Sequence, residues 1–449
     1  MHRTNKSCFT SLMSLPLLVS LSLALAVSSL SACGGGGTGT APVPAPAPAP
    51  QYVQYSSQAG SATGTLSSPP TTTGNSIGIT IDTGPAASPG QVNKPYVSVT
   101  VCTPGATTAT TACQTIDHVL LDTGSTGLRL FHSVLYSTLM LPAATNGFVA
   151  YGECQPFMIG TTWGSVRNAD IYLGGEVARS VAIQDIGDAP GGYSSIPTYC
   201  LGYGNMLSTP VQYGANGILG VGVFKNDCAT CTAVAGPGAY YACTSSGCSA
   251  STVTASQIVQ NPVANFSQDN NGMLVNIASI GSTGSASGSV AGTATFGINT
   301  QSDNQLNGAT VYTADTSGNM NTTFNGSTLT SFLDTGSNAL FFDDSSIPVC
   351  TTINTWLYCP ASSPLQLSAT NSGANNLPQP GTSTPFSIIS GGAVPVGTVA
   401  ANIGGPYPGL FMSFDWGLPF FFGRQVAVAI GGTNVTIAGV PTPGPFFAY

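Results

Sequence analysis

The chain has 449 residues, a length typical of two to three domains, and only 5% of them are charged. Because 8 Lys and Arg stand against 16 Asp and Glu, no basic surface can neutralise phosphates, and we expect no nucleic-acid binding. The 56 Gly and 32 Pro interrupt short runs rich in Val, Ile, Thr, Tyr and Phe, and no long segment has 3.6-residue apolar periodicity. The composition therefore predicts an all-β protein with many short strands.

The N-terminal segment has the organisation of a secretory signal. Basic residues precede an apolar run at 12–30, and small residues follow it. The sequence Leu-Ser-Ala-Cys at 30–33 resembles the bacterial lipobox, in which the Cys is lipidated and becomes the first residue of the mature protein; an ordinary signal peptide with a chance Cys is the alternative. The resemblance implies a signal peptide over 1–32 and a lipid on Cys33. Because Gly34 follows, it also implies sorting to the outer membrane of a bacterial cell envelope.

The next segment, 33–70, has the composition of a tether. Four Gly residues follow the Cys, then Ala-Pro repeats, then a stretch rich in Ser, Gln and Thr. Gly gives flexibility, and Ala-Pro repeats give an extended, polyproline-like chain. We expect this linker to hold a folded part away from a membrane to which only the lipid attaches it.

Asp-Thr-Gly occurs three times, beginning at Asp82, Asp122 and Asp334. The last two are followed by Ser and lie in matching apolar frames, HVLLDTGSTGLRLF at 118–131 and LTSFLDTGSNALFF at 329–342. After the first, Pro takes the place of Ser and no apolar strand follows. A lone Asp-Thr-Gly is usually a turn after a strand. We therefore assign Asp82 to a turn and pair Asp122 with Asp334.

Cysteine usage agrees with export. Of 12 Cys, Cys8 lies in the signal segment and Cys33 is the expected anchor, which leaves ten for disulfides in an oxidising compartment. Spacing predicts the pairs Cys102–Cys113 and Cys350–Cys359, with Cys154 left for Cys200. The remaining four lie together as CATC…CTSSGC, a pattern that fits disulfides better in an exported protein but also fits a zinc ribbon. These four are Cys228, Cys231, Cys243 and Cys248.

Several segments resemble the pepsin-like aspartic peptidases in the same order. The strands KPYVSVTVCTPG and QTIDHVLLDTGSTGLRL lead into the first motif, and GANGILGVG at 214–222 resembles the segment that closes that family's N-terminal lobe. In the second half, TATFGINTQSDNQLNGATVYTA at 293–314 precedes the second motif, and LPFFFGRQVAVAIGG at 418–432 resembles the strand that closes the C-terminal lobe. The layout also resembles a bacterial family of uncharacterised, secreted lipoproteins that contain Asp-Thr-Gly.

The resemblance covers most of the chain after the linker and implies a two-lobed, all-β, pepsin-like fold with one Asp-Thr-Gly-Ser loop per lobe. The expected lobes are 71–265 and 275–449, joined at 266–274. Asp122 and Asp334 are then the catalytic pair. Two facing carboxylates cannot both ionise cheaply, so they share one proton, and they need neither a metal nor a cofactor.

The other motif residues support the pair. Gly124 and Gly336 are expected to allow a tight turn that presents each acid. The resemblance implies that Thr123 and Thr335 lock the two loops to each other across the lobes. Ser125 and Ser337 would hydrogen-bond the outer carboxylate oxygens, as the last members of the supporting set.

The flap that covers the cleft in this family departs from its usual pattern here. Tyr151 with the following Gly resembles the flap pair but lies several residues too far from the returning strand. Trp163 is the second candidate for the aromatic lid, with packing under the hairpin as its alternative role. Asp415 precedes the closing strand, where a position lining the cleft is the less favoured interpretation. His118 and His132 lack the frame of a metal site.

Two functions are consistent with these features. The first is an envelope-anchored aspartic endopeptidase acting, as a monomer, on peptide or protein substrates held in extended form. The second, favoured by the unusual flap, is a catalytically silent pepsin-like binding lipoprotein. A purely structural envelope lipoprotein is a weaker third interpretation.

Overall fold

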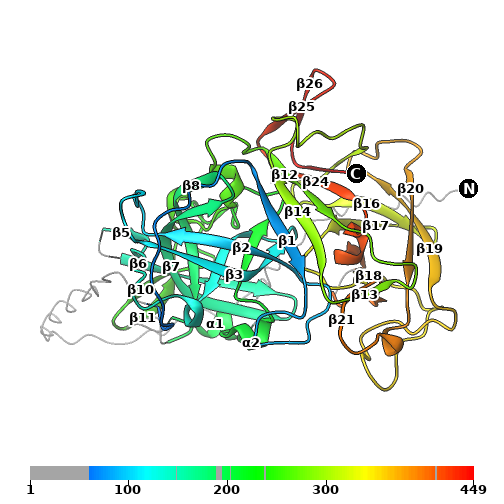
Figure 1. Ribbon diagram of the computed structural model, residues 1–449, viewed down its shortest axis with the longest axis horizontal. Coiled ribbons are helices and arrows are strands. Elements are labelled where there is room, and N and C mark those ends of the chain that lie inside the picture. The colour runs from blue at the N-terminus through cyan, green and yellow to red at the C-terminus, as the bar shows by residue number, and fades with distance from the viewer. Residues whose placement is uncertain (1–59, 148, 189–194, 203, 237–238, 410–411) are drawn as a thin grey trace, which may run out of the picture. The chain divides into compact units, whose positions relative to one another are not determined.

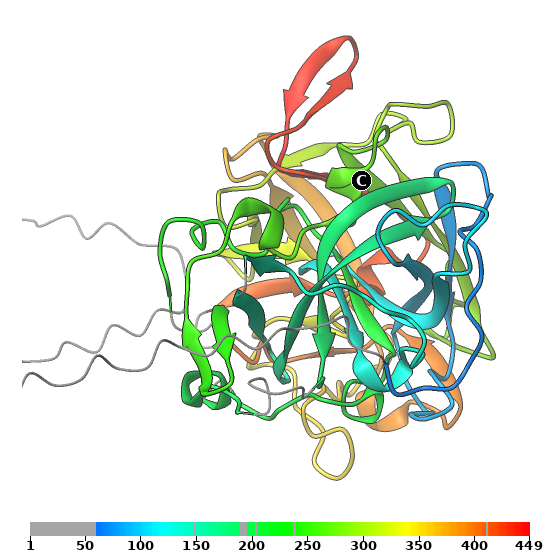
Figure 2. The ribbon, with the colours of Figure 1, turned by 90° about the vertical axis from the view of Figure 1, so that its left-hand side faces the viewer.

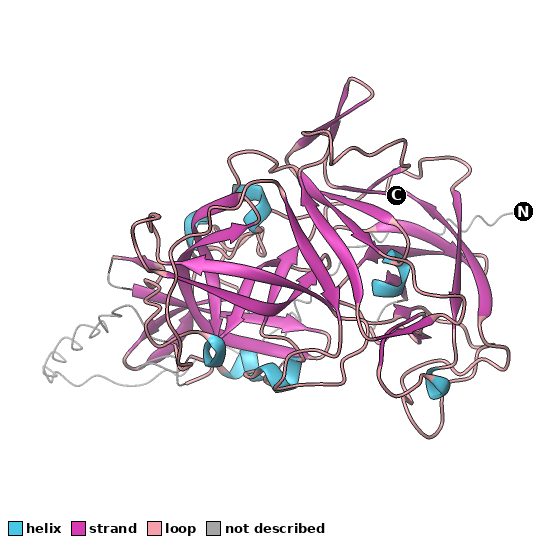
Figure 3. Ribbon diagram, viewed as in Figure 1, coloured by secondary structure: helices cyan, strands magenta, loops and turns pink. Residues whose placement is uncertain are grey.

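The computed structural model describes residues 60–147, 149–188, 195–202, 204–236, 239–409 and 412–449. The predicted signal peptide, Cys33 and most of the predicted linker lie outside these residues. By its contacts the chain separates into Met1–Ala49 and Pro50–Tyr449, and all described residues belong to the second unit. Strands dominate this unit (Figure 3), which confirms the all-β prediction. In the described part of the chain, no helix has the length and apolar character needed to cross a membrane.

The strands of the first half are β1 (Ser76–Ile81), β2 (Pro95–Cys102), β3 (Cys113–Asp122), β4 (Thr126–Phe131), β5 (Thr145–Asn146), β6 (Val149–Phe157), β7 (Gly160–Leu173), β8 (Glu176–Ile186), β9 (Gly217–Val221), β10 (Tyr240–Thr244) and β11 (Gly247–Ala250). The strands of the second half are β12 (Gly272–Ile277), β13 (Ser285–Ser287), β14 (Val290–Phe296), β15 (Val311–Thr313), β16 (Met320–Phe324), β17 (Ser327–Leu333), β18 (Leu340–Phe341), β19 (Leu365–Ser372), β20 (Thr382–Ile388), β21 (Thr398–Ala401), β22 (Gly404–Gly405), β23 (Ser413–Trp416), β24 (Gln425–Ala429), β25 (Asn434–Ile437), β26 (Val440–Pro443) and β27 (Phe446–Ala448). The helices are α1 (Thr198–Leu201) and α2 (Pro210–Tyr213), with short 3₁₀ turns at His132–Val134, Ala255–Gln257, Pro262–Asn265, Gly391–Ala393 and Leu418–Phe421.

One large sheet runs through both halves of the chain. Its strands lie in the order β11-β10-β6-β7-β8-β4-β9-β3-β2-β1-β14-β12-β24-β27-β15. In Figure 1, β1, β14 and β12 stand between the first-half strands on the left and the second-half strands on the right. β1 pairs with β14 along its full length, from Ser76 opposite Thr295 to Ile81 opposite Val290. A second sheet, β20-β19-β16-β17-β23-β18-β22, belongs to the second half alone. The result is two lobes joined by a shared sheet, as predicted.

The two Asp-Thr-Gly-Ser loops occupy equivalent positions in the two lobes. In the first, β3 runs parallel to β9 and β4 runs antiparallel to the same strand. In the second, β17 runs parallel to β23 and β18 runs antiparallel to it. β4 and β9 are buried along their whole length, which explains why their sequences are apolar without alternation. The matching apolar frames therefore report a repeated arrangement of three strands.

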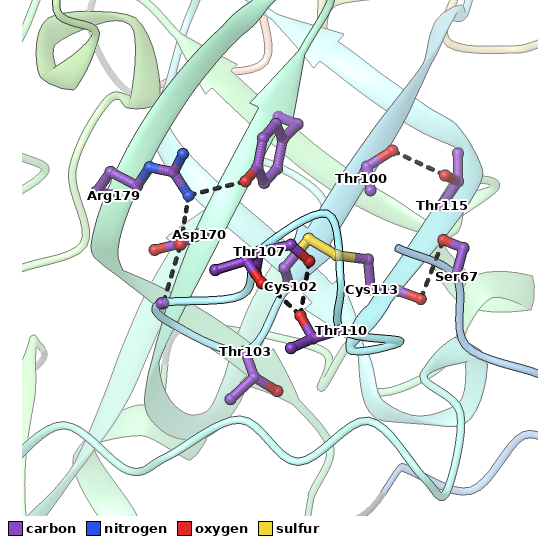
Figure 4. Close-up of a disulfide and its surroundings, with 12 residues drawn as sticks. Ser67, Thr100, Cys102, Thr103, Thr107, Thr110, Cys113, Thr115, Asp170 and Arg179 are labelled. Carbon is purple, nitrogen blue, oxygen red and sulfur yellow. Dashed lines mark hydrogen bonds and ion pairs between the residues drawn. A yellow bond between two sulfur atoms is a disulfide. The ribbon is translucent and has the colours of Figure 1, made fainter. Parts of the chain in front are cut away.

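Residues 60–70, where the predicted linker ends, lie along the first lobe. Ala62 bridges to Tyr136, and Ser67 bridges to Cys113 at the start of β3. Figure 4 shows this region, where the Cys102–Cys113 disulfide joins the ends of β2 and β3. Beside it, Thr100 and Thr115 share a hydroxyl hydrogen bond of 2.7 Å. The chain is therefore fixed to the lobe before the first strand begins.

Five disulfides form among the ten Cys that were expected to pair. The predicted pairs Cys102–Cys113, Cys154–Cys200 and Cys350–Cys359 are confirmed. The four remaining Cys form Cys228–Cys231 and Cys243–Cys248, so the zinc-ribbon alternative is wrong. The second of these closes the β10–β11 hairpin at opposed positions. The outermost hairpin, β25–β26, projects at the top of Figure 2 and carries no disulfide.

The hydrophobic core extends through both lobes. In the second lobe it contains a cluster of rings, with Phe414 stacked between Phe342 at 5.1 Å and Trp416 at 4.3 Å between centroids. Trp416 Nε1 donates to Thr322 Oγ1 at 2.9 Å, which satisfies the one polar atom of the largest buried side chain. This packing holds β23 rigidly beside the second Asp-Thr-Gly-Ser loop.

Candidate active site

Asp122 is the last residue of β3, and its own loop holds its carboxylate. The Gly124 amide donates to Asp122 Oδ1 at 2.8 Å, and Ser125 Oγ donates to Oδ2 at 2.5 Å. The side chain is buried. Each oxygen of a buried acid therefore has a donor, as its burial requires.

Asp334 directly follows β17 and is held in the same way. The Gly336 amide donates to Asp334 Oδ1 at 2.7 Å, and Ser337 Oγ lies 2.9 Å from Oδ2. The two carboxyls are also hydrogen-bonded to each other. The structure thus brings together the two acids that the sequence paired.

The third acid, Asp82, lies apart in the turn after β1. Its Oδ1 accepts from the Gly84 amide at 2.8 Å, and its Oδ2 lies 3.2 Å from His118 Nε2. Its assignment to a turn is therefore consistent with the structure. His132 contacts Asp185 at 3.0 Å, and among the described residues no cluster of three metal-ligating side chains occurs.

Thr123 and Thr335 join the two loops through four hydrogen bonds. Thr123 Oγ1 donates to the Leu333 carbonyl at 2.8 Å, and Thr335 Oγ1 donates to the Leu121 carbonyl at 2.6 Å. Each hydroxyl also accepts from the other residue's amide at 3.0 Å. Both side chains are buried, so losing either would leave several polar groups unpaired. The interlocking role implied by the resemblance is what these contacts provide.

The two glycines serve close approach rather than an unusual backbone conformation. Neither Gly124 nor Gly336 has a positive φ. A Cβ on Gly124 would lie 2.5 Å from Asp334 Cγ, and a Cβ on Gly336 would lie 2.6 Å from Asp122 Oδ1. Each glycine therefore backs the carboxyl of the opposite lobe. The Ser337 amide donates to the Asp334 carbonyl at 3.3 Å, so the second loop makes the expected tight turn. The structure adds a second reason for each glycine, since the facing acid occupies the place of a Cβ.

The pair retains a proton at neutral pH. Burial, the charge of Asp122 and the hydrogen bond with Asp122 raise the pKa of Asp334 to about 8, against the opposing effects of Ser337 and the Gly336 amide. Two carboxyls in direct contact cannot both ionise without a large cost in free energy. Asp334 is therefore the partner that holds the proton.

A third carboxyl, Asp415 on β23, adjoins the pair. Its Oδ2 lies 2.6 Å from Ser337 Oγ, and its side chain is only 5% exposed. Burial, then the charges of Asp334 and Asp122, raise the pKa of Asp415 well above its usual range. The sequence singled out Asp415 only as a less favoured cleft residue, and its apolar surroundings in FDWG gave no indication that it touches Ser337.

The expected flap is the β6–β7 hairpin, and neither predicted aromatic residue is at its tip. Tyr151 packs in a buried cluster with Tyr240, and Trp163 packs against Tyr241 with centroids 5.5 Å apart. The tip consists of Met158 and Ile159, both exposed. The buried position of Trp163 fits its alternative packing role.

Two other aromatic residues lie near the acids. The phenol of Tyr213, at the end of α2, has its pKa raised by burial and by the charges of Asp122 and Asp334. Phe157, one residue before the hairpin tip, meets the Tyr213 ring edge-on at 5.8 Å. Sequence reasoning missed both, because Phe157 lies in the unfamiliar insertion and Tyr213 lies outside the motifs.

A buried ion cluster fixes the β6–β7 hairpin to β4, the strand that follows the first Asp-Thr-Gly-Ser loop. Arg129 on β4 donates from Nη2 to Glu153 on β6 at 2.5 Å and to Asp227 at 2.8 Å. Tyr240 donates to Asp227 at 2.8 Å, and Cys154 beside Glu153 is tied to Cys200. Arg129 is fully buried, in a chain with few charges. The base of the hairpin is therefore anchored.

The fold and this site define an all-β protein of two lobes whose Asp-Thr-Gly-Ser loops meet at one pair of acids. The chain belongs to the family described as "Protein of unknown function (DUF3443)", whose model matches residues 71–449. No curated protein matches it. Among solved structures it is similar to the aspartic proteinase from Irpex lacteus, at 18% identity over 79% of this chain and 94% of that chain, with a TM-score of 0.47. This distant likeness does not address activity.

Proposed function

We propose that the chain is an aspartic endopeptidase that hydrolyses peptide bonds with a water molecule activated between Asp122 and Asp334. The observation that carries the proposal is the pair itself: two acids in equivalent loops meet, and burial together with the charge of Asp122 raises the pKa of Asp334 to about 8. The four threonine contacts across the lobes keep this arrangement fixed. Preorganised acids of this kind suit general acid–base chemistry.

The asymmetry of the pair assigns the two roles. Asp122 acts as the base and takes a proton from water as the water oxygen attacks the peptide carbon, while protonated Asp334 gives its proton to the carbonyl oxygen. In the resulting intermediate the carbon carries two hydroxyl groups. When the C–N bond breaks, the proton on Asp122 passes to the departing nitrogen and one hydroxyl returns its proton to Asp334. Protons and charge balance, and the pair recovers its starting state.

The expected location and substrate belong to the same proposal. A lipid on Cys33 would attach the protein to the outer membrane, and the linker would hold the two lobes away from it. The cleft expected between two lobes of strands would suit an extended peptide or protein segment, paired partly through its backbone. The protein would act as a monomer, because both acids come from one chain.

A silent binding protein remains the second candidate, and the anchored hairpin favours it. The Arg129–Glu153 ion pair and the Cys154–Cys200 disulfide restrain the element that would close over a substrate. Lid closure completes the site in many enzymes. A restrained lid is compatible with binding an extended segment without cleaving it.

A cleavage assay separates the two candidates. The purified protein is incubated with a peptide library from pH 3 to 9, with and without pepstatin, and the products are identified by mass spectrometry. An enzyme loses cleavage in Asp122→Asn and in Asp334→Asn and keeps it in Asp82→Asn, the matched Asp-Thr-Gly control. Each single loss is expected to be nearly as severe as the double, because the acids act as a unit.

Absence of cleavage by the wild type at every pH, with peptide binding retained in both variants, would favour the binding protein. Undiminished cleavage after Asp122→Asn would contradict both candidates.

A further inference from the structure

The hydroxyl of Ser337 stands between two carboxyls. It lies 2.9 Å from Asp334 Oδ2 and 2.6 Å from Asp415 Oδ2. A hydroxyl has one hydrogen, so it can donate to only one of them. The other contact is favourable only if that carboxyl carries a hydrogen and donates it to the Ser337 oxygen.

The first lobe has no counterpart of this contact. Leu120 pairs with Ile218 in the first lobe, and Phe332, at the same position before its Asp, pairs with Asp415 in the second. Asp415 therefore occupies the place of Ile218, an apolar residue that is fully buried. In the described structure, the only acid that Ser125 contacts is Asp122. The repeat is broken by one acid, at the position that reaches a catalytic loop.

Asp415 has little to stabilise a negative charge. Its Oδ1 is buried and has no hydrogen-bond partner among the described residues. No ion pair in the described part of the chain involves Asp415, Asp334 or Asp122. The titratable groups that face it are these two acids and the phenol of Tyr407, whose pKa is raised partly by Asp415. Since none of them is a cation, an ionised Asp415 would be costly beside an ionised pair.

We propose that Asp415 is a positioning residue that acts through Ser337 as a proton reserve for the catalytic pair. When Asp415 is protonated, it donates to Ser337 Oγ, and the Ser337 hydrogen points to Asp334 Oδ2. When Asp415 loses its proton, Ser337 turns its hydrogen to Asp415, and the new negative charge strengthens the hold of Asp334 on its own proton. One acid of the pair has already lost its proton in this state, and the other proton is held in the hydrogen bond between Asp122 and Asp334. The next proton lost from the three acids as pH rises therefore comes from Asp415, and Asp334 stays protonated. The inference rests on the proposed function for its effect on catalysis.

The consequence for activity is a wider pH range. An active pair needs protonated Asp334, so the alkaline limb of kcat/KM reports the loss of that proton. Without the charge of Asp415, Asp334 loses its proton at lower pH. A neighbouring like charge typically shifts a carboxyl by one unit or more, so we expect the alkaline limb to move by about 1 pH unit toward acid.

The test compares the pH dependence of kcat/KM for the wild type with two variants and a control. Asp415→Asn keeps a donor toward Ser337 but cannot ionise, so its alkaline limb should move about 1 unit toward acid. Asp415→Ile installs the residue of the first lobe, so it should show the same shift and a lower plateau. Asp303→Asn removes an exposed acid and should change neither. An alkaline limb that is unchanged in Asp415→Asn would overturn the proposal.

A second measurement does not depend on catalysis. In the full protein with ¹³C-labelled aspartate, pH titration of the carboxyl signals should show a carboxyl that stays protonated above pH 6 and disappears in Asp415→Asn. Asp122→Asn should lower the pH at which that signal titrates, since it removes a neighbouring negative charge that disfavours ionisation of Asp415. An Asp415 signal that titrates near pH 4 would overturn the proposal even if the protein cleaved nothing. The expected titration without any peptide cleavage would instead contradict the proposed function alone.

Discussion

Replacing Asp334 with Asn should make the protein more stable at neutral pH while removing its activity. The folded protein holds a proton on Asp334 up to about pH 8, whereas the unfolded chain releases it near the ordinary value of 3.8. For an acid whose pKa is raised by folding, this contribution to stability is fully present below pH 3.8 and is lost as pH rises toward 8. Asn resembles the protonated acid in shape and cannot ionise in either state, so the variant should not suffer this loss.

The size of the effect follows from the interval between the two pKa values. Each pKa unit corresponds to about 1.4 kcal/mol. The difference in free energy of unfolding between the variant and the wild type should therefore grow by at most about 4 kcal/mol from pH 3.5 to pH 7, in favour of the variant. Asp334 is half-buried rather than enclosed, and solvent at its open side lowers this figure. We therefore expect a gain of about 2 kcal/mol.

Urea unfolding measures this difference. It is done with the disulfides intact and followed by tryptophan fluorescence at pH 3.5, 5, 7 and 8.5. The gap between Asp334→Asn and wild type should widen from pH 3.5 to 7 and level off near pH 8. Asp82→Asn is the matched control; it loses the contact with His118 and should gain no stability toward neutral pH. A gap that stays constant between pH 3.5 and 8.5 would refute the assignment of the shared proton to Asp334.

Two further predictions concern the support of the site and its attachment. Thr335→Val keeps the side-chain shape but removes the hydroxyl that donates to Leu121 and accepts from Thr123. It should therefore lower the free energy of unfolding by about 2 kcal/mol and reduce kcat. Equal urea midpoints for the variant and the wild type would contradict the interlocking role. Cys33→Ser should release the protein from the membrane fraction or block its maturation, because one residue would carry the lipid; unchanged membrane fractionation on immunoblots would count against the lipoprotein prediction.

The sequence was informative where a chemical requirement was repeated in each lobe. The apolar frame around Asp122 reflects β4 and β9, which are buried along their whole length and leave no room for alternation. The absence of such a frame after Asp82 separated a turn from the two Asp-Thr-Gly-Ser loops. Close spacing was likewise enough for Cys102–Cys113 and Cys350–Cys359, since few geometries join residues so near in sequence.

The sequence was silent where a residue acts on one distant in the chain. Asp415 reaches Ser337 because β17 and β23 run parallel, and 78 residues separate the two. The reason for Gly124 also lies in the other lobe, since Asp334 occupies the space that its Cβ would need. Tyr213 and Phe157 come together only after the hairpin folds over α2. None of these contacts has a local sequence pattern.

The hairpin is where the two functional candidates can be told apart on structural grounds. Its base cannot lift freely, because moving Glu153 from Arg129 would leave the buried Glu153 carboxylate without its cation, at a cost of about 3 kcal/mol or more. The tip beyond Cys154 is not restrained in that way, and its Met158 and Ile159 are exposed. If the protein is an enzyme, closure over a substrate must therefore be confined to the tip, where Phe157 already rests on Tyr213 beside the acids. The anchored base then restricts the motion to a short segment, so the ion cluster favours a silent protein only if the tip cannot close over a substrate.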